Sequence, residues 1–149
     1  MKSIFNKPDR TEIIGRIDTL NQHCKPGWGK MSVEQMVKHC ILCEDYYIGM
    51  VVVKRSFIGR IIGKMALKGI LKPENTMLRK NAPTAPIFLV AGPVNDLESQ
   101  KNIWKVLIES YNNYPNQYFS HWFFGKMTKE QLGQFVYIHC NHHLTQFNA

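Results

Sequence analysis

The sequence has no apolar run of the ~18 residues that a membrane-spanning helix requires. Its first fourteen residues lack an apolar signal core and a small-residue cleavage site. Only 4 of the 149 residues are cysteine, too few for a disulfide-stapled secreted scaffold, and 10 glycines and 7 prolines exclude a low-complexity class. We therefore expect a cytoplasmic chain with reduced thiols, folded as a single domain over residues 1–149.

Helical spacing of the apolar residues predicts four long helices and one further helix. The long helices are expected over residues 8–21, from Ser32 through Tyr47, from Asn95 or Asp96 through Tyr114, and from Thr128 to about Phe147; the further helix covers 56–71. Two of the long helices begin at capping boxes, Ser32 with Gln35 and Thr128 with Gln131. These boxes lie in a near-repeat, because Gly29–Met36 is echoed by Gly125–Leu132.

The remaining segments are not helical in pattern. Three prolines exclude a helix between residues 81 and 95, where Ile87–Val90 is expected to form a short extended segment. The aromatic residues 115–127 are interpreted as a loop. The predicted fold class is all-α: a four-helix bundle with an extra basic crossover helix and a short extended segment.

Acidic residues are scarce: 11 Asp and Glu stand against 19 Lys and Arg, which gives a net charge of +8. Most of this excess lies in residues 54–80. Two rows recur there every four residues, the basic row Arg60, Lys64 and Lys68 and the apolar row Phe57, Ile61 and Met65. Because Phe57 is the only ring, base stacking would be poor, and we expect no nucleic-acid partner. The favoured interpretation is the solvated face of a helix that covers the bundle.

Three of the six histidines are packed into residues 139–143. His139 and His143 are one helical turn apart, and this spacing lets one helix present two nitrogens to one metal ion. His39 is the expected third ligand. At ~100° per residue from their N-caps, the three side chains fall within ~80° of one another, so they are expected to face one interior. Three neutral imidazoles leave one coordination position open for water or substrate.

Other interpretations of these residues stay open. H-x-x-x-H alone is a weak motif, and a single histidine such as His39 is more often a hydrogen-bonded core residue. Cys43, four residues after His39, is either the fourth ligand of a closed zinc site or a small buried hydrophobic side chain. Cys40 and Cys140 are expected to pack in the core, and His142 is expected beside the site. The sequence contains no H-E-x-x-H, glycine-rich phosphate loop or G-x-S-x-G.

Four segments, taken in order, resemble signatures of the DinB/YfiT-like superfamily, in a branch described only as a domain of unknown function. They are Trp28–His39, Pro83–Pro86, His121–Thr128 and His139–Phe147. The resemblance implies a four-helix bundle that forms a homodimer, with His39, His139 and His143 as metal ligands. It also implies that Gln146 supports these ligands.

The ligand type favours Zn²⁺ or Ni²⁺, and some superfamily members resemble thiol-dependent S-transferases. We therefore predict a metal-dependent transferase or hydrolase that acts on a small-molecule substrate, with a low-molecular-weight thiol as a candidate. Candidates for a general base are His142, His121, Glu44 and Tyr46, and Trp28 is a candidate for the pocket mouth. The alternative is a non-enzymatic, stress-related module that binds anionic membrane or nucleic acid through residues 54–80.

Overall fold

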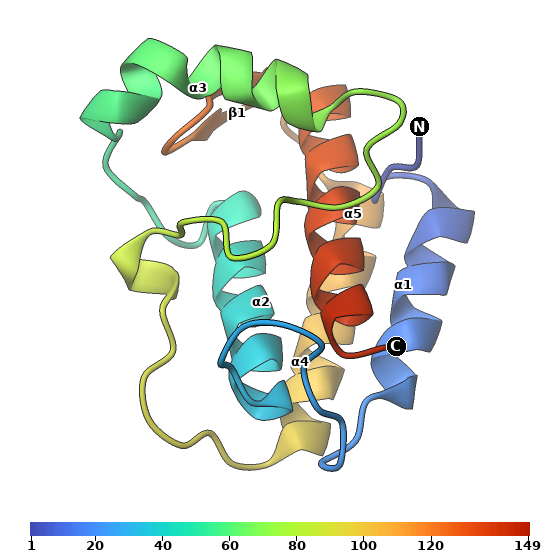
Figure 1. Ribbon diagram of the computed structural model, residues 1–149. Helices are drawn as coiled ribbons and strands as arrows, with labels where there is room; N and C mark the ends of the chain where they lie inside the picture. Colours follow the sequence, from blue (N-terminus) through green and yellow to red (C-terminus); the bar gives the residue numbers. More distant parts are fainter.

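The structure, a computed structural model, describes residues 1–149 and is mostly helical, with one small sheet (Figure 1). The helices are α1 (Lys7–Thr19), α2 (Val33–Tyr47), α3 (Phe57–Ile70), α4 (Leu97–Ser110) and α5 (Lys129–Gln146). The strands are β1 (Tyr118–His121) and β2 (Gly125–Thr128), and short 3-10 turns cover Pro86–Phe88 and Tyr111–Asn113. No helix combines the length and the apolar character needed to cross a membrane.

Four of the helices, α1, α2, α4 and α5, pack around a shared core. α2 packs on α4, α4 packs on α1, and α1 packs on α5 (Figure 1). Trp104 of α4, Met36 of α2 and Ile17 of α1 are fully buried at their centre. α2 and α5 then face each other across a wider space, and large side chains from both helices fill it. This space holds the histidines.

The helix starts follow the predicted capping signals. Ser32 and Thr128 each form a complete capping box with the glutamine three residues later, at the starts of α2 and α5. Asp96, and not Asn95, caps α4: its Oδ1 accepts the backbone N–H of Ser99 at 3.0 Å. Because these caps satisfy the first free N–H groups, they fix the residue at which each helix begins.

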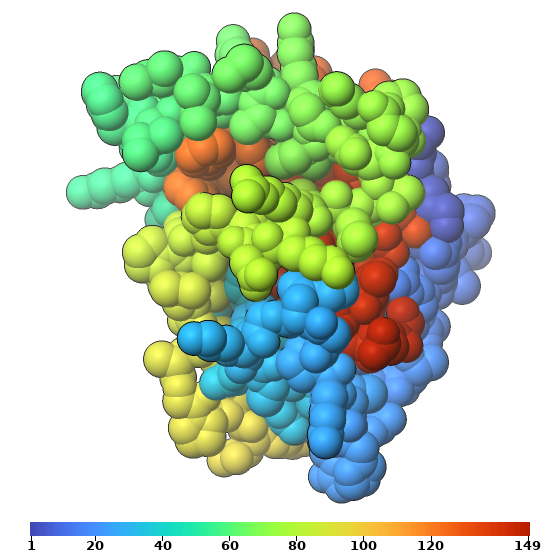
Figure 2. All heavy atoms as spheres, viewed as in Figure 1, coloured from blue at the N-terminus to red at the C-terminus, as the bar shows by residue number.

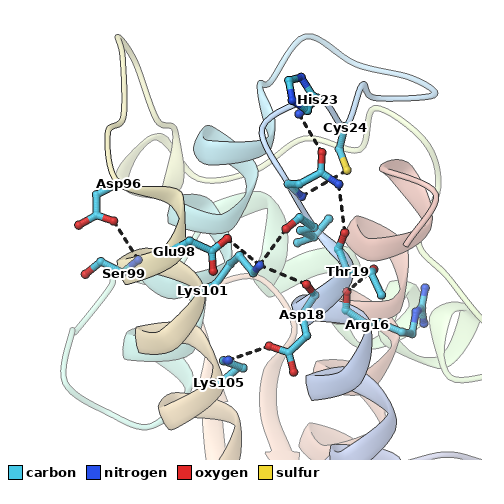
Figure 3. A network of polar contacts seen from close by, with 12 residues as sticks. Arg16, Asp18, Thr19, His23, Cys24, Asp96, Glu98, Ser99, Lys101 and Lys105 are labelled. Atoms are coloured by element: carbon cyan, nitrogen blue, oxygen red, sulfur yellow. Dashed lines mark hydrogen bonds and ion pairs between the residues drawn. The ribbon is translucent and has the colours of Figure 1, made fainter.

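A buried lysine ties α1 to α4 (Figure 3). Lys101 Nζ donates to the backbone oxygens of Leu20 at 2.8 Å and Asp18 at 3.2 Å, at the end of α1, and also pairs with Glu98 at 2.9 Å. Lys105 Nζ bonds the Asp18 carboxylate at 2.7 Å. A cation at a helix C-terminus is stabilised by the unpaired carbonyls there, so these contacts hold the two helices in register.

The predicted extended segment at Ile87–Val90 is wrong. Pro86–Phe88 forms a 3-10 turn instead, in which Phe88 is buried while Ile87 and Leu89 are exposed. Proline suits the first position of a helical turn, because its φ is fixed there and its missing N–H leaves no bond unmade. No second strand lies beside this segment to pair with it.

The aromatic segment interpreted as a loop contains the sheet. β1 and β2 pair antiparallel, with His121 opposite Gly125 and Tyr118 opposite Thr128. Gly125 has a φ of +83°, which suits glycine at the end of a three-residue hairpin turn. His121 completes the turn, since its Nδ1 accepts the N–H groups of Phe123 at 3.1 Å and Phe124 at 3.2 Å.

Candidate metal centre

The three predicted ligand histidines meet in the space between α2 and α5. The ring centres lie 4.9 Å apart for His39 and His143, 4.8 Å for His139 and His143, and 5.5 Å for His39 and His139. All three residues are buried. Three imidazoles that hold one Zn²⁺ tetrahedrally, at Zn–N distances of about 2.0–2.1 Å, have ring centres roughly 5 Å apart. The spacing of the ring centres is therefore in the range for a shared ion, although the ligand nitrogens of the three rings do not form one group within 4.8 Å.

The hydrogen bond of His39 decides which nitrogen it offers. His39 Nδ1 lies 2.8 Å from the backbone oxygen of Phe88. A carbonyl oxygen only accepts, so Nδ1 must carry the proton. In the neutral ring Nε2 then has a free lone pair, and it faces the Cys43 thiol at 3.7 Å. This is the tautomer that a metal ligand needs.

A chain of two hydrogen bonds fixes His143 in the same way. Gln146 Nε2 donates to the Trp28 backbone oxygen at 2.7 Å, which orients the amide. Its Oε1 therefore faces His143 Nδ1, at 3.0 Å, and accepts the ring proton. The Nε2 lone pair of His143 stays free. Gln146 thus links His143 to the loop that precedes α2.

His139 lies between these two rings and differs from them. Its Nδ1 is buried and has no hydrogen-bond partner. Glu44 of α2 and Cys140 place ligand atoms within 4.8 Å of a ring nitrogen of His139 and of each other. An unpaired nitrogen in the core is costly unless a ligand, a water or an ion satisfies it.

Cysteines join the donor atoms around His139. His39, Cys43 and His139 form one group whose ligand atoms all lie within 4.8 Å of one another, and Cys40, His139 and His143 form another. His39 and His143 fall in different groups, so the three histidines bind one ion only if their rings turn slightly. Cys40, which sequence analysis assigns to core packing, is therefore also a candidate ligand. Its angle on α2 did not predict this, because the angle does not show how far side chains of α5 reach toward α2.

Burial keeps the imidazoles neutral. It lowers the pKa of His143 to about 3, with a further contribution from His39, and it lowers the pKa of His139 well below its usual value. Burial also lowers the pKa of His39, against the opposing bond to Phe88. Neutral imidazole is the form that binds metal. The pKa of the Cys43 thiol is raised well above its usual value, by burial first and then by Glu44.

Glu44 is a buried acid at the back of the site. Burial raises its pKa to about 7, and hydrogen bonds from Tyr111 and Cys140 act in the opposite direction. The Tyr111 hydroxyl donates to Oε2 at 2.5 Å, and the Cys140 thiol donates to Oε1 at 3.3 Å. Glu44 is fully buried, so it reaches His139 but not solvent.

The remaining predicted residues divide into two places. His142 lies beside the cluster, 5.1 Å from His143 and 5.4 Å from Trp28 between ring centres, and its buried Nδ1 has no partner. His121 belongs to the hairpin, where burial, followed by the charge of Arg55, lowers its pKa to about 3. Trp28 is thus part of the histidine cluster. Trp122, in contrast, packs on His121 and Phe123 of the hairpin.

The long connection between α3 and α4 covers the site, and the loop between α1 and α2 lies beside it (Figure 2). Hydrogen bonds fasten this connection to both site helices: Phe88 binds His39, the Thr76 oxygen accepts from Asn141 at 2.6 Å, and the Gly92 oxygen accepts from Gln35 at 2.8 Å. Two surface hollows lie elsewhere, one by the N-terminus and one on α4. The histidines of the cluster are buried, and each is only 5–7% exposed.

A family model described as "Protein of unknown function (DUF1569)" matches residues 5–149. The chain belongs to the DUF1569 family. The match includes both site helices and the connection that covers them, so the histidine cluster lies within the DUF1569 region. No curated protein and no solved structure matches the chain.

Proposed function

We propose that this DUF1569 protein binds a divalent metal ion, Zn²⁺ or Ni²⁺ by ligand type, through His39, His139 and His143. The observation that carries the proposal is the pair of fixed tautomers. Phe88 and Gln146 each hold a proton on Nδ1, so two Nε2 lone pairs remain free beside a third neutral ring in the core. Such a cluster is costly when dry and empty, and a cation relieves that cost.

The arrangement of the long helices supports a wider proposal about ancestry. One ligand comes from the early helix α2 and two, one turn apart, come from the late helix α5. This is the placement that the resemblance to the DinB/YfiT-like superfamily implies. We therefore propose that DUF1569 proteins share its four-helix bundle and its type of metal centre.

For activity we propose a metal-dependent transferase or hydrolase acting on a small-molecule substrate. The ion supplies Lewis acidity, which activates a water or a low-molecular-weight thiol at an open position. Among the candidate bases, His142 is the best placed, because its ring centre lies 5.1 Å from that of His143, its buried Nδ1 has no partner, and its lowered pKa keeps it neutral. The Nδ1 of His121 and the hydroxyl of Tyr46 already bind the hairpin backbone, and Glu44 is sealed in the core.

Metal content tests the site directly. We expect purified protein to carry one equivalent of metal, measured by plasma mass spectrometry, and His139→Ala to carry about tenfold less. His23→Ala is the matched control, because His23 is exposed and lies in the loop after α1. Circular dichroism should show that both variants are folded. Equal metal in wild type and His139→Ala contradicts the proposal.

The cobalt-substituted protein separates an open site from a closed one. A cysteine ligand produces a thiolate-to-cobalt charge-transfer band in the near ultraviolet, whereas three histidines and a solvent ligand do not. We expect no such band, because the proposed ligands are three imidazoles, with the fourth position left to solvent or substrate. A band that disappears in Cys43→Ala would show a closed, structural site and would overturn the enzymatic part of the proposal alone.

A further inference from the structure

α3 is attached to the rest of the protein by glycines. It crosses one end of the molecule above the hairpin (Figure 1). Gly59 and Gly63 are buried against the hairpin turn, where an added Cβ would lie 2.4 Å and 2.1 Å from the Phe123 backbone oxygen. Leu67 continues the same buried edge. The buried face of α3 is thus narrow and carries mostly small side chains. A helix that covers a core normally buries its large apolar residues instead.

The large apolar side chains of α3 point to solvent instead. The exposed fractions are 76% for Phe57, 61% for Ile58, 71% for Ile61 and 70% for Met65. At ~100° per residue these four fall within about 100° of the helix circumference, so they form one continuous face. An exposed apolar face of this kind marks a site of interaction with another body.

The basic row borders this apolar face. Arg60, Lys64 and Lys68 are all exposed. Arg60 and Lys64 lie between the apolar face and the buried glycine edge, and Lys68 continues the row beyond Met65 at the C-terminal end of the apolar face. The segment around them, residues 54–80, contains one acid, Glu74. An exposed apolar face with a basic border is the pattern of a helix that lies in the interface of a membrane.

We propose that α3 docks on an anionic membrane surface, with the face of Phe57, Ile58, Ile61 and Met65 inserted among the lipids and the basic row on the headgroups. Insertion removes apolar surface from water, and each nearby Lys or Arg adds attraction to anionic lipid. This proposal is independent of the metal centre.

The observations favour lipid over two other occupants. A second copy docked symmetrically on this face would bring two basic rows together, which like-charge repulsion opposes. Nucleic acid would neutralise the basic row but would leave the aliphatic side chains Ile58, Ile61 and Met65 in water, and it needs stacking rings that the face lacks apart from Phe57. An anionic membrane can bury the apolar face and pair its headgroups with the basic row at the same time.

Vesicle co-sedimentation tests the proposal with the full chain. We expect binding to vesicles of phosphatidylcholine and phosphatidylserine in equal parts, and binding to pure phosphatidylcholine to be on the order of tenfold weaker. Ile61→Glu and Lys64→Glu should each weaken binding to the mixed vesicles about tenfold. Added salt should weaken binding as well, because it screens the lysines and arginines.

Matched controls separate the face from general charge. Val106→Glu places the same carboxylate at an α4 position that is 70% exposed, and Lys25→Glu reverses an exposed charge in the loop after α1. Both controls should bind as wild type does. The proposal is overturned by equal binding to both vesicle types, or by losses in the controls equal to those in α3.

Two further measurements give the competing occupants their own outcomes. Sedimentation equilibrium without vesicles should show a monomer, or a dimer that Ile61→Glu leaves intact. A dimer that Ile61→Glu dissociates would assign the face to a second copy and overturn the proposal. Binding of duplex DNA that is lost in Lys64→Glu but kept in Ile61→Glu, without vesicle binding, would overturn it in favour of nucleic acid.

Discussion

At the scale of single residues, two oxygen atoms select the metal-binding form of the histidines. The Phe88 carbonyl and the Gln146 amide each accept an Nδ1 proton, and the amide is itself oriented by Trp28. Residues that orient a ligand in this way commonly change metal affinity by 10–100-fold when they are replaced. Neither oxygen belongs to a titratable group, so the selection holds at any pH at which the rings are neutral.

Replacing Gln146 should weaken the site without removing a ligand. Gln146→Leu keeps the side-chain volume but lacks the oxygen that holds the His143 proton, so we expect metal affinity to fall about 10–100-fold. Competition with a chromophoric chelator measures this change. Gln134→Leu, at a half-buried position of the same helix, should bind as wild type does. Unchanged affinity in Gln146→Leu would show that the amide does not orient His143.

The convergence of His39, His139 and His143 was within reach of sequence reasoning, but the surroundings of these residues were not. The turn spacing of His139 and His143 and the count from the Ser32 cap are properties of a helix, so they predict that the rings converge. The Phe88 oxygen is a backbone atom and has no signature in the sequence. Cys40 and Glu44 join the cluster only because α2 and α5 face each other, and that distance is set by packing.

At the scale of elements, capping chemistry was the most reliable guide. Ser32 and Thr128 fix the starts of α2 and α5, and Gly29 and Gly125, which precede them in the near-repeat, both have positive φ values of 82° and 83°. The hairpin was missed although its signal was present. Burial alternates along β2, with Gly125 and Met127 buried and Lys126 exposed, but four residues are too few for that period to stand out.

Glycine should prove essential at one point of α3 and dispensable at another. Gly63→Ala places a Cβ against the Phe123 backbone oxygen, so the helix must shift, and we expect a loss of about 1–3 kcal/mol in the free energy of unfolding. Gly69→Ala, in the same helix, meets no atom within 4 Å. It should be neutral or stabilising by up to about 1 kcal/mol, because alanine favours the helix. Urea unfolding measures both; equal effects would contradict the glycine contact.

At the scale of the whole molecule, the buried histidines make the metal-free fold sensitive to acid. The pKa values of His121 and His143 are about 3 in the folded protein, against 6.5 in the unfolded chain. The unfolded state therefore binds more protons below pH 6.5, and stability is lost as the pH falls. Each group should cost about 2 kcal/mol of folding free energy by about pH 5.

Glu44 acts in the opposite direction. Its pKa is about 7 when folded against 4.5 when unfolded, so its contribution is fully present below pH 4.5 and is lost as the pH rises through 7. Acidification to about pH 5 thus increases the free energy of unfolding by about 2 kcal/mol through Glu44. Urea unfolding of chelator-treated protein should show lower stability at about pH 5 than at neutral pH, and a steeper loss in Glu44→Gln. A loss no steeper in Glu44→Gln would contradict the raised pKa.

The connection between α3 and α4 affects how an ion could enter or leave the histidine cluster. Because this connection is hydrogen-bonded to His39 through Phe88, any opening on that side removes the acceptor that holds the proton of His39 on Nδ1. If the site binds the proposed ion, opening of this connection and metal binding are thermodynamically linked, and each affects the other equally. An ion bound to His39 in this tautomer would favour the closed connection, so metal binding should slow hydrogen exchange along residues 71–96.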